Sequence, residues 1–115
     1  GQVRFDPAAV EAALEGLYGS VNDTRGTGST IGFEQGRERI FNAPGVRVWG
    51  KTGTAQLGTT PPNSHAWIVG YAGMPNEQPS LAFAVIVEAQ EGASEQTGGR
   101  VAAPIAQAVI EAAFP

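Results

Sequence analysis

The apolar positions near the N-terminus have the spacing of a helix with one apolar face. Asp6 followed by Pro7 is a favourable helix start, because an aspartate side chain accepts orphan N–H groups and proline suits the first helical position. A helix is therefore predicted over about residues 7–20. Its apolar stripe consists of residues three or four positions apart: Val10, Leu14, Leu17, Tyr18 and Val21. This helix is expected to cover a surface and to carry no chemistry.

Three later segments have the pattern of strands, predicted over about residues 46–56, 65–73 and 81–89. In the first strand, a period of two places Lys51 and Gly53 on one face and Thr52 and Thr54 on the other, unless a bulge at Gly53 resets the phase. Because short connections join the three strands, they are expected to form an antiparallel meander.

The second and third strands are apolar almost without interruption, which indicates burial on both faces of the sheet. A last helix is predicted over about residues 100–114, with Pro104 either in its first turn or at a kink. Its expected apolar stripe is Val101, Ile105, Val109 and Ala112. If both helices pack on one face of the sheet, the other face must be covered by something that this chain lacks.

The remaining segments are harder to assign. Residues 22–29 and 57–64, the latter with Pro61, have the composition of loops, as do residues 90–99. The stretch from Ile31 to Asn42 is ambiguous and is read as a short helical turn holding Phe33, Ile40 and Phe41. The predicted fold class is α+β, with an antiparallel sheet of about three strands flanked by N- and C-terminal helices. With no repeat or linker, residues 1–115 form one segment of one domain.

Composition narrows the functional classes. The chain has 115 residues, 42% of them apolar, which suffices for one modest core but not for a two-domain enzyme. Its 7 basic and 11 acidic residues give a net charge of -4, and neither sign forms a run, so nucleic acid is not an expected partner. No cysteine is present, and no apolar run is long enough to span a membrane. The opening Gly1-Gln2-Val3 lacks an initiator methionine, so the chain is expected to be a processed product, a recombinant product or the tail of a longer protein, and it is treated as a fragment.

The candidate chemistry lies in Lys51-Thr52-Gly53-Thr54. On an extended backbone this run presents a cation, two hydroxyls and unhindered N–H groups, which can hold a carboxylate or a developing oxyanion. An exposed lysine that protects a sheet edge is the ordinary alternative. Lys51 is the only lysine, however, and a glycine inside a strand indicates close approach by another backbone.

Other candidates are weaker. Ser64 and His65 are adjacent on a strand, point to opposite faces and cannot readily form a catalytic pair, so a structural role is expected for His65. With one histidine and no cysteine, neither a metal site nor a cofactor is predicted. Ser20-Val21-Asn22 matches a Ser-x-Asn pattern, but it closes the first helix and is rejected as a functional motif.

The order of these features resembles the C-terminal part of a penicillin-binding protein transpeptidase domain, most closely the monofunctional class B enzymes. The resemblance spans essentially all 115 residues. It rests on the upstream helix followed by 25–28, the run 50–56, the strand 64–72, the apolar strand ending at Glu88, Gly98-Gly99 and the run 102–106.

The resemblance implies a role for each residue of the run. The backbone N–H of Thr54 would belong to an oxyanion hole. The hydroxyls of Thr52 and Thr54, beside Gly53, would hold the terminal carboxylate of a peptidoglycan stem peptide or of a β-lactam. Lys51 would supply positive potential and bond toward the serine of a Ser-x-Asn motif elsewhere.

The sequence also departs from the family pattern. A Ser-x-x-Lys nucleophile motif needs a serine three positions before a lysine, and position 48 is Val48. The nucleophile and the Ser-x-Asn motif are therefore expected in an upstream part of the protein, and the isolated chain is predicted to be inactive. The implied location is the bacterial cell envelope, at the outer face of the cytoplasmic membrane or in the periplasm, with an anchor outside this chain. A serine β-lactamase or β-lactam sensor of the same fold, and a non-catalytic interaction module, are the alternatives.

Overall fold

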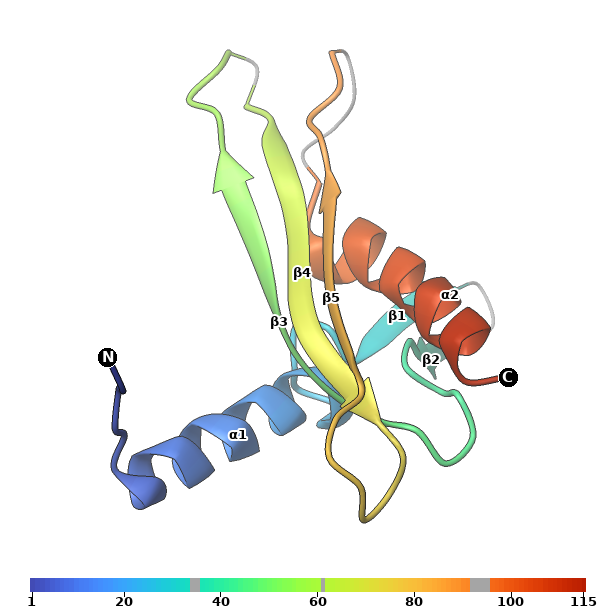
Figure 1. Cartoon of the computed structure of the whole chain (residues 1–115). Coiled ribbons are helices and arrows are strands. Elements are labelled where there is room, and N and C mark those ends of the chain that lie inside the picture. Colours follow the sequence, from blue (N-terminus) through green and yellow to red (C-terminus); the bar gives the residue numbers. More distant parts are fainter. Residues whose placement is uncertain (34–35, 61, 92–95) are drawn as a thin grey trace.

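A computed structural model describes residues 1–33, 36–60, 62–91 and 96–115. In chain order the elements are α1 (Pro7–Asn22), β1 (Thr30–Phe33), β2 (Gly36–Arg39), β3 (Arg47–Gln56), β4 (Ser64–Gly73), β5 (Leu81–Val87), a π-helical turn η1 (Gly98–Ala102) and α2 (Ala103–Ala113). Figure 1 shows the sheet of β3, β4 and β5 at the centre of the molecule, with α2 along one side and α1 projecting from the lower end of the sheet. The α+β fold predicted from the sequence is confirmed.

The main sheet has the order β3-β4-β5, with both pairs antiparallel. The register is continuous from Arg47 opposite Gly73 to Gln56 opposite Ser64, so no bulge interrupts β3 at Gly53. Because residues directly opposite share a face, Thr52 lies on the face of Ile68, whereas Lys51 lies on the face of Val69. The predicted meander and the predicted separation of Lys51 from Thr52 are both confirmed.

The core lies between one face of this sheet and α2. Ala66, Ile68 and Ala72 of β4 are buried there, together with Ile110 of α2 and Val21 at the end of α1. The helix reaches the sheet partly through small residues, since Ala103 and Ala106 are buried beside Ile110, whereas the buried Gln107 donates hydrogen bonds to Asn42 and Glu111. Small side chains let a helix backbone approach a sheet closely, which is why the alanines face inward.

The expected apolar stripe of the last helix is therefore wrong. Ile105 and Val109 are 46% and 44% exposed, and they lie on the side of α2 away from the core. Pro104 stands at the helix start, where it removes no helical hydrogen bond.

The segment 31–42 also differs from its prediction as a helical turn. Residues on either side of positions 34–35, which are outside the described part of the chain, form a two-stranded antiparallel hairpin with Thr30 opposite Arg39. Gly36 has φ +130°, a conformation that a helix does not allow. Ile40 and Phe41 follow β2 and are buried in the core. Pro61 and residues 92–95 in the predicted loops 57–64 and 90–99 likewise lie outside the described residues.

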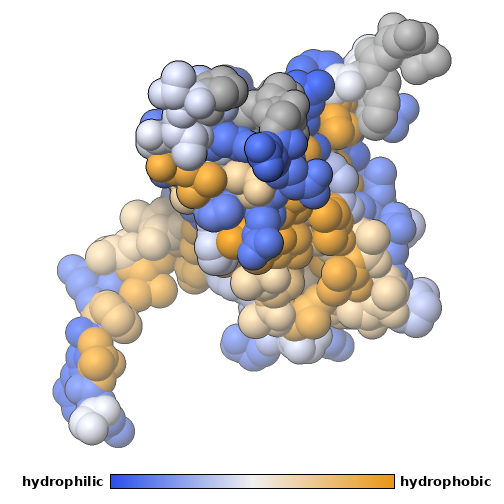
Figure 2. Space-filling view, turned by 90° about the horizontal axis from the view of Figure 1, so that it is seen from above, coloured by the Kyte–Doolittle hydropathy of each residue, from blue (hydrophilic) through white to orange (hydrophobic). Residues whose placement is uncertain are grey.

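Burial on both faces of β4 and β5 is not found in this chain. Trp67, Val69 and Ile86, on the face opposite α2, are 39%, 47% and 43% exposed. The helix α1 covers only the lower end of that face, where Tyr18 contacts Trp49. Its N-terminal half extends away from the body as an arm with apolar side chains on its surface, which Figure 2 shows from above. In the described residues no helix is long and apolar enough to cross a membrane.

Candidate functional site

The run Lys51 to Thr54 lies on β3, which is an edge strand of the main sheet. Lys51 and Thr54 are exposed, and Thr52 and Gly53 are half-buried. The Lys51 ammonium donates a hydrogen bond from Nζ to the carbonyl oxygen of Thr52 at 2.7 Å. The cation is thereby held along the strand edge.

Thr27 is a further residue at this place, and sequence reasoning did not select it. Its Oγ1 lies 2.6 Å from Oγ1 of Thr52. The loop that carries it is fixed to the end of α1, because the N–H of Gly28 donates to the carbonyl of Ser20 at 3.1 Å and the N–H of Gly26 donates to that of Asp23 at 2.8 Å. A glycine-rich loop after a helix was the only sequence signal, and it indicates a turn rather than a site.

Gly98 and Gly99 of η1 lie next to the Lys51 to Thr54 run, and both are buried. A Cβ on Gly98 would collide with the backbone of Trp67 and Gly53, and one on Gly99 would collide with the carbonyl oxygen of Thr27. Here the backbone of η1 approaches β3, β4 and the Thr27 loop too closely for any side chain. The backbone of Gly53 is therefore close to Gly98, but a Cβ on Gly53 itself would meet only Cβ of Trp67, at an ordinary contact distance of 3.5 Å.

These elements enclose a groove of about 540 Å³. We call it the Lys51–Thr54 groove, and its lining residues are Thr27, Lys51, Thr52, Gly53, Thr54, Thr97, Gly98 and Gly99. Four of the eight are threonine, one is lysine, and none is acidic. A groove with one cation and several hydroxyls favours an anionic ligand that accepts hydrogen bonds. All four residues predicted from the sequence line it.

The weaker candidates have structural contacts instead. Nδ1 of His65 accepts the N–H of Ala89 at 2.8 Å, whereas Oγ of the buried Ser64 donates to the carbonyl of Gln96 at 2.7 Å. Asn22, from the rejected Ser-x-Asn match, donates from Nδ2 to the carbonyls of Tyr18 and Val48, each at 2.9 Å. It therefore joins α1 to β3. The described residues contain no group of three or more metal-binding side chains.

Three ionisable groups near α1 and β4 have shifted pKa values: Asp23, Tyr71 and Arg25, whose pKa is raised by its hydrogen bond to Asp23. Asp23 accepts hydrogen bonds from the side chain and the N–H of Arg25, and these lower the pKa of its carboxyl to about 2. Burial raises the pKa of Tyr71, whose ring stacks on Trp49 at a centroid distance of 5.2 Å. Arg47 lies over the same Trp49 ring at 4.9 Å and over the Tyr18 ring of α1 at 5.4 Å, so this cluster helps hold α1 on the sheet.

The edge strand, the groove and the helices together define a class of protein. Residues 1–111 match the family model of the penicillin binding protein transpeptidase domain. The chain belongs to this family, and the resemblance found in the sequence is confirmed.

Individual relatives agree with this assignment. The chain is 44% identical over 86 residues to the peptidoglycan D,D-transpeptidase PbpA of Mycobacterium tuberculosis, an alignment covering 73% of this chain and 17% of that protein. It is 34% identical over 117 residues to the peptidoglycan D,D-transpeptidase MrdA of Haemophilus influenzae, covering 90% of this chain and 16% of that protein. The chain thus spans about a sixth of the length of these relatives. No solved structure matches.

Proposed function

We propose that this chain is the substrate-binding C-terminal part of a peptidoglycan D,D-transpeptidase, which cross-links stem peptides in the cell envelope and is acylated by β-lactams. The observation that carries the proposal is the Lys51–Thr54 groove, where a cation and four threonines lie beside a strand edge and none of the described lining residues is acidic. The names of the relatives PbpA and MrdA support the same reaction.

The edge of β3 suits an extended peptide. Residues of an antiparallel pair alternate between those that bond across the pair and those whose N–H and C=O groups point away from it. The Thr52 carbonyl accepts a hydrogen bond from Lys51 Nζ, which is expected of a carbonyl that points away from β4. By alternation Thr54 shares this orientation, so its N–H faces outward and can pair with an added peptide strand.

The reaction we propose is the one that the family resemblance implies. A serine of the upstream part, within its Ser-x-x-Lys motif, attacks the carbonyl of the penultimate D-alanine, and the peptide bond to the terminal D-alanine breaks as that residue leaves. An amine of a neighbouring stem then attacks the acyl-serine ester, which forms the cross-link and frees the serine. A β-lactam acylates the same serine when its ring opens.

This chain would supply the groups that bind and polarise. The outward N–H of Thr54 would donate to the oxyanion, a contribution of about 3–4 kcal/mol per donor in hydrolases. The hydroxyls of Thr52 and Thr54 would hold the terminal carboxylate, and Lys51 would supply positive potential. Since the only lysine has Val48 three positions before it, the chain would not form the acyl-enzyme alone.

Labelling with a fluorescent penicillin tests the proposal. The complete protein should be acylated at a serine outside this segment, and the isolated segment should remain unlabelled. Labelling of the isolated segment at one of its own serines would contradict the proposal. Rapid hydrolytic turnover of penicillin by the complete protein would indicate a β-lactamase, and no acylation at all would indicate a non-catalytic module.

A further inference from the structure

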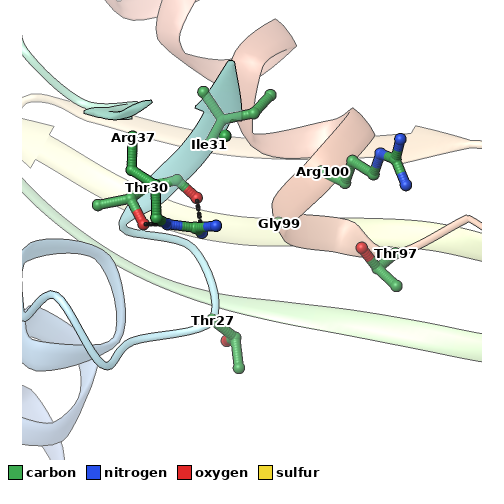
Figure 3. A pocket seen from close by; sticks show the side chains of 8 residues that line it. Thr27, Thr30, Ile31, Arg37, Thr97, Gly99 and Arg100 are labelled. Carbon is green, nitrogen blue, oxygen red and sulfur yellow. Dashed lines mark hydrogen bonds between the residues drawn. The ribbon is translucent and has the colours of Figure 1, made fainter. Parts of the chain in front are cut away.

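A second cavity adjoins the Lys51–Thr54 groove. It has a volume of about 350 Å³ and is lined by Gly32 and by seven residues labelled in Figure 3: Thr27, Thr30, Ile31, Arg37, Thr97, Gly99 and Arg100. We call it the Arg37–Arg100 cavity. Three residues, Thr27, Thr97 and Gly99, line both cavities, so the two lie side by side on either flank of the Thr27 loop and η1.

Arg37 of β2 lies opposite Gly32 of β1, and its side chain is oriented by Thr30, two positions from Gly32 on the same strand. Its Nε donates to Oγ1 of Thr30 at 3.0 Å, and its Nη2 donates to the carbonyl oxygen of Thr30 at 3.2 Å. Figure 3 shows the guanidinium reaching from β2 past Thr30 toward the middle of the cavity. These two bonds use two of the five N–H donors of an arginine, and the others are available to a ligand.

Arg100 stands on the opposite side, on η1, with its guanidinium directed outward (Figure 3). Arg37 and Arg100 are both exposed, but the Arg100 guanidinium points outward and therefore adds charge at the rim of the cavity. The cavity is polar otherwise, with three threonines among its eight lining residues.

The charge of this region is opposite to that of the chain. The net charge is -4, yet three of the seven basic residues, Lys51, Arg37 and Arg100, line the two cavities, and none of the described lining residues of either cavity is acidic. Among the described residues, neither Arg37 nor Arg100 has a carboxylate within ion-pair distance. The ion pair that the described residues do form joins Arg25 to Asp23, outside this cavity. Guanidinium groups without a carboxylate partner are suited to bind one from a ligand.

We propose that the Arg37–Arg100 cavity is a second carboxylate subsite. It binds a side-chain carboxylate of a peptide whose terminal carboxylate occupies the Lys51–Thr54 groove. The inference rests on the proposed function for the peptide substrate, and it adds that this substrate is at least dianionic. The two subsites use the same kinds of groups, a cation beside threonine hydroxyls, and they share Thr27 and Thr97 between them.

The test compares two stem-peptide thioesters in the complete protein. The peptides differ only at one side chain, which ends in a carboxylate in one and a carboxamide in the other. The wild-type protein should prefer the carboxylate peptide in kcat/KM. Arg37→Gln should reduce that preference about tenfold, which corresponds to roughly 1.4 kcal/mol. Arg100→Gln, at the rim, should reduce it about threefold, or roughly 0.6 kcal/mol.

Control variants separate this role from a structural one. Arg37→Lys, which keeps the charge, should retain most of the preference, and Arg4→Gln, in the exposed segment before α1, should leave it unchanged. Fluorescent-penicillin acylation should be unaffected in all four variants, which shows that the fold and the Lys51–Thr54 groove are intact.

The outcomes distinguish the two proposals. Penicillin acylation without any preference for the carboxylate peptide, or with a preference that survives Arg37→Gln, overturns the subsite and leaves the transpeptidase proposal standing. If the wild-type protein reacts with neither the penicillin nor the peptides, both proposals fall.

Discussion

Thr27 and Thr52 are joined by their hydroxyl groups, with the two Oγ1 atoms 2.6 Å apart, although one lies in the loop after α1 and the other in the middle of β3. A hydroxyl that donates to its neighbour keeps its own lone pairs for a further donor, and the neighbour can donate onward. This bond therefore fixes how Thr52 presents its hydroxyl to the groove.

Replacing Thr27 by valine should weaken the groove without unfolding the protein. The change removes the partner of Thr52 while keeping the shape, and because Thr27 is exposed the loss of stability should be below about 1 kcal/mol. Penicillin acylation of the complete protein should slow about 3- to 10-fold, measured by stopped-flow labelling. Thr24→Val, on an exposed turn of the same loop, is the matched control, and an equal effect there would contradict a specific role for Thr27.

Lys51→Gln should act on binding and not on folding. Lys51 is exposed and its described partner is the carbonyl of Thr52, so thermal unfolding of the complete protein should change little. Loss of a charged hydrogen bond to the ligand carboxylate costs about 1.5–3 kcal/mol, so acylation should fall roughly 10- to 100-fold. Lys51→Arg should recover part of the rate. A Lys51→Gln protein with wild-type acylation kinetics would exclude the lysine from the site.

Gly98→Ala should destabilise the protein by at least about 2 kcal/mol, because the added methyl group collides with the backbone of β3 and β4. Chemical denaturation of the complete protein measures this effect. Gly16→Ala provides the control, since nothing lies within 4 Å of a Cβ at that helical position. It should stabilise α1 by about 0.5–1 kcal/mol. A neutral Gly98→Ala would show that η1 does not pack on β3 as described.

The Asp23 carboxyl should titrate near pH 2, followed by NMR of its side-chain carbon. The folded state lowers this pKa, so the associated stability is present above the ordinary value of 3.8 and is lost as the pH falls from about 4 to about 2. Arg25→Gln should return the pKa toward its ordinary value, since the hydrogen bond from Arg25 is the main cause. An unchanged pKa in that variant would assign the shift to another group.

Much of the fold could be predicted because long periodic segments dominate it. The strands β3 to β5 and the two helices each extend over seven residues or more, and their turn residues are clear. The short strands β1 and β2 lacked such a signal, since Gly32 and Gly36 interrupt a four-residue pattern on each side. The buried face of α2 was mistaken because hydrophobicity favours Ile105 over Ala106, whereas close packing on the sheet favours the smaller residue.

The site was predictable only in part for a similar reason. Lys51, Thr52, Gly53 and Thr54 are consecutive, so their types and spacing are visible in the sequence. Thr27 and Thr97 reach the same groove from distant segments, and only tertiary contacts bring them there. Arg37 is a comparable case, because its place depends on a hairpin that the sequence did not reveal.

Close backbone contact at Gly98 and Gly99 has one more consequence. Because main-chain atoms of η1, β3 and the Thr27 loop touch there without intervening side chains, the spacing between the walls of the groove is set by the backbone itself. Rotamer changes cannot widen or narrow it. Substitutions of the threonines and the lysine can therefore alter which anions the groove prefers. The length of bound peptide that fits between the backbone walls stays constant.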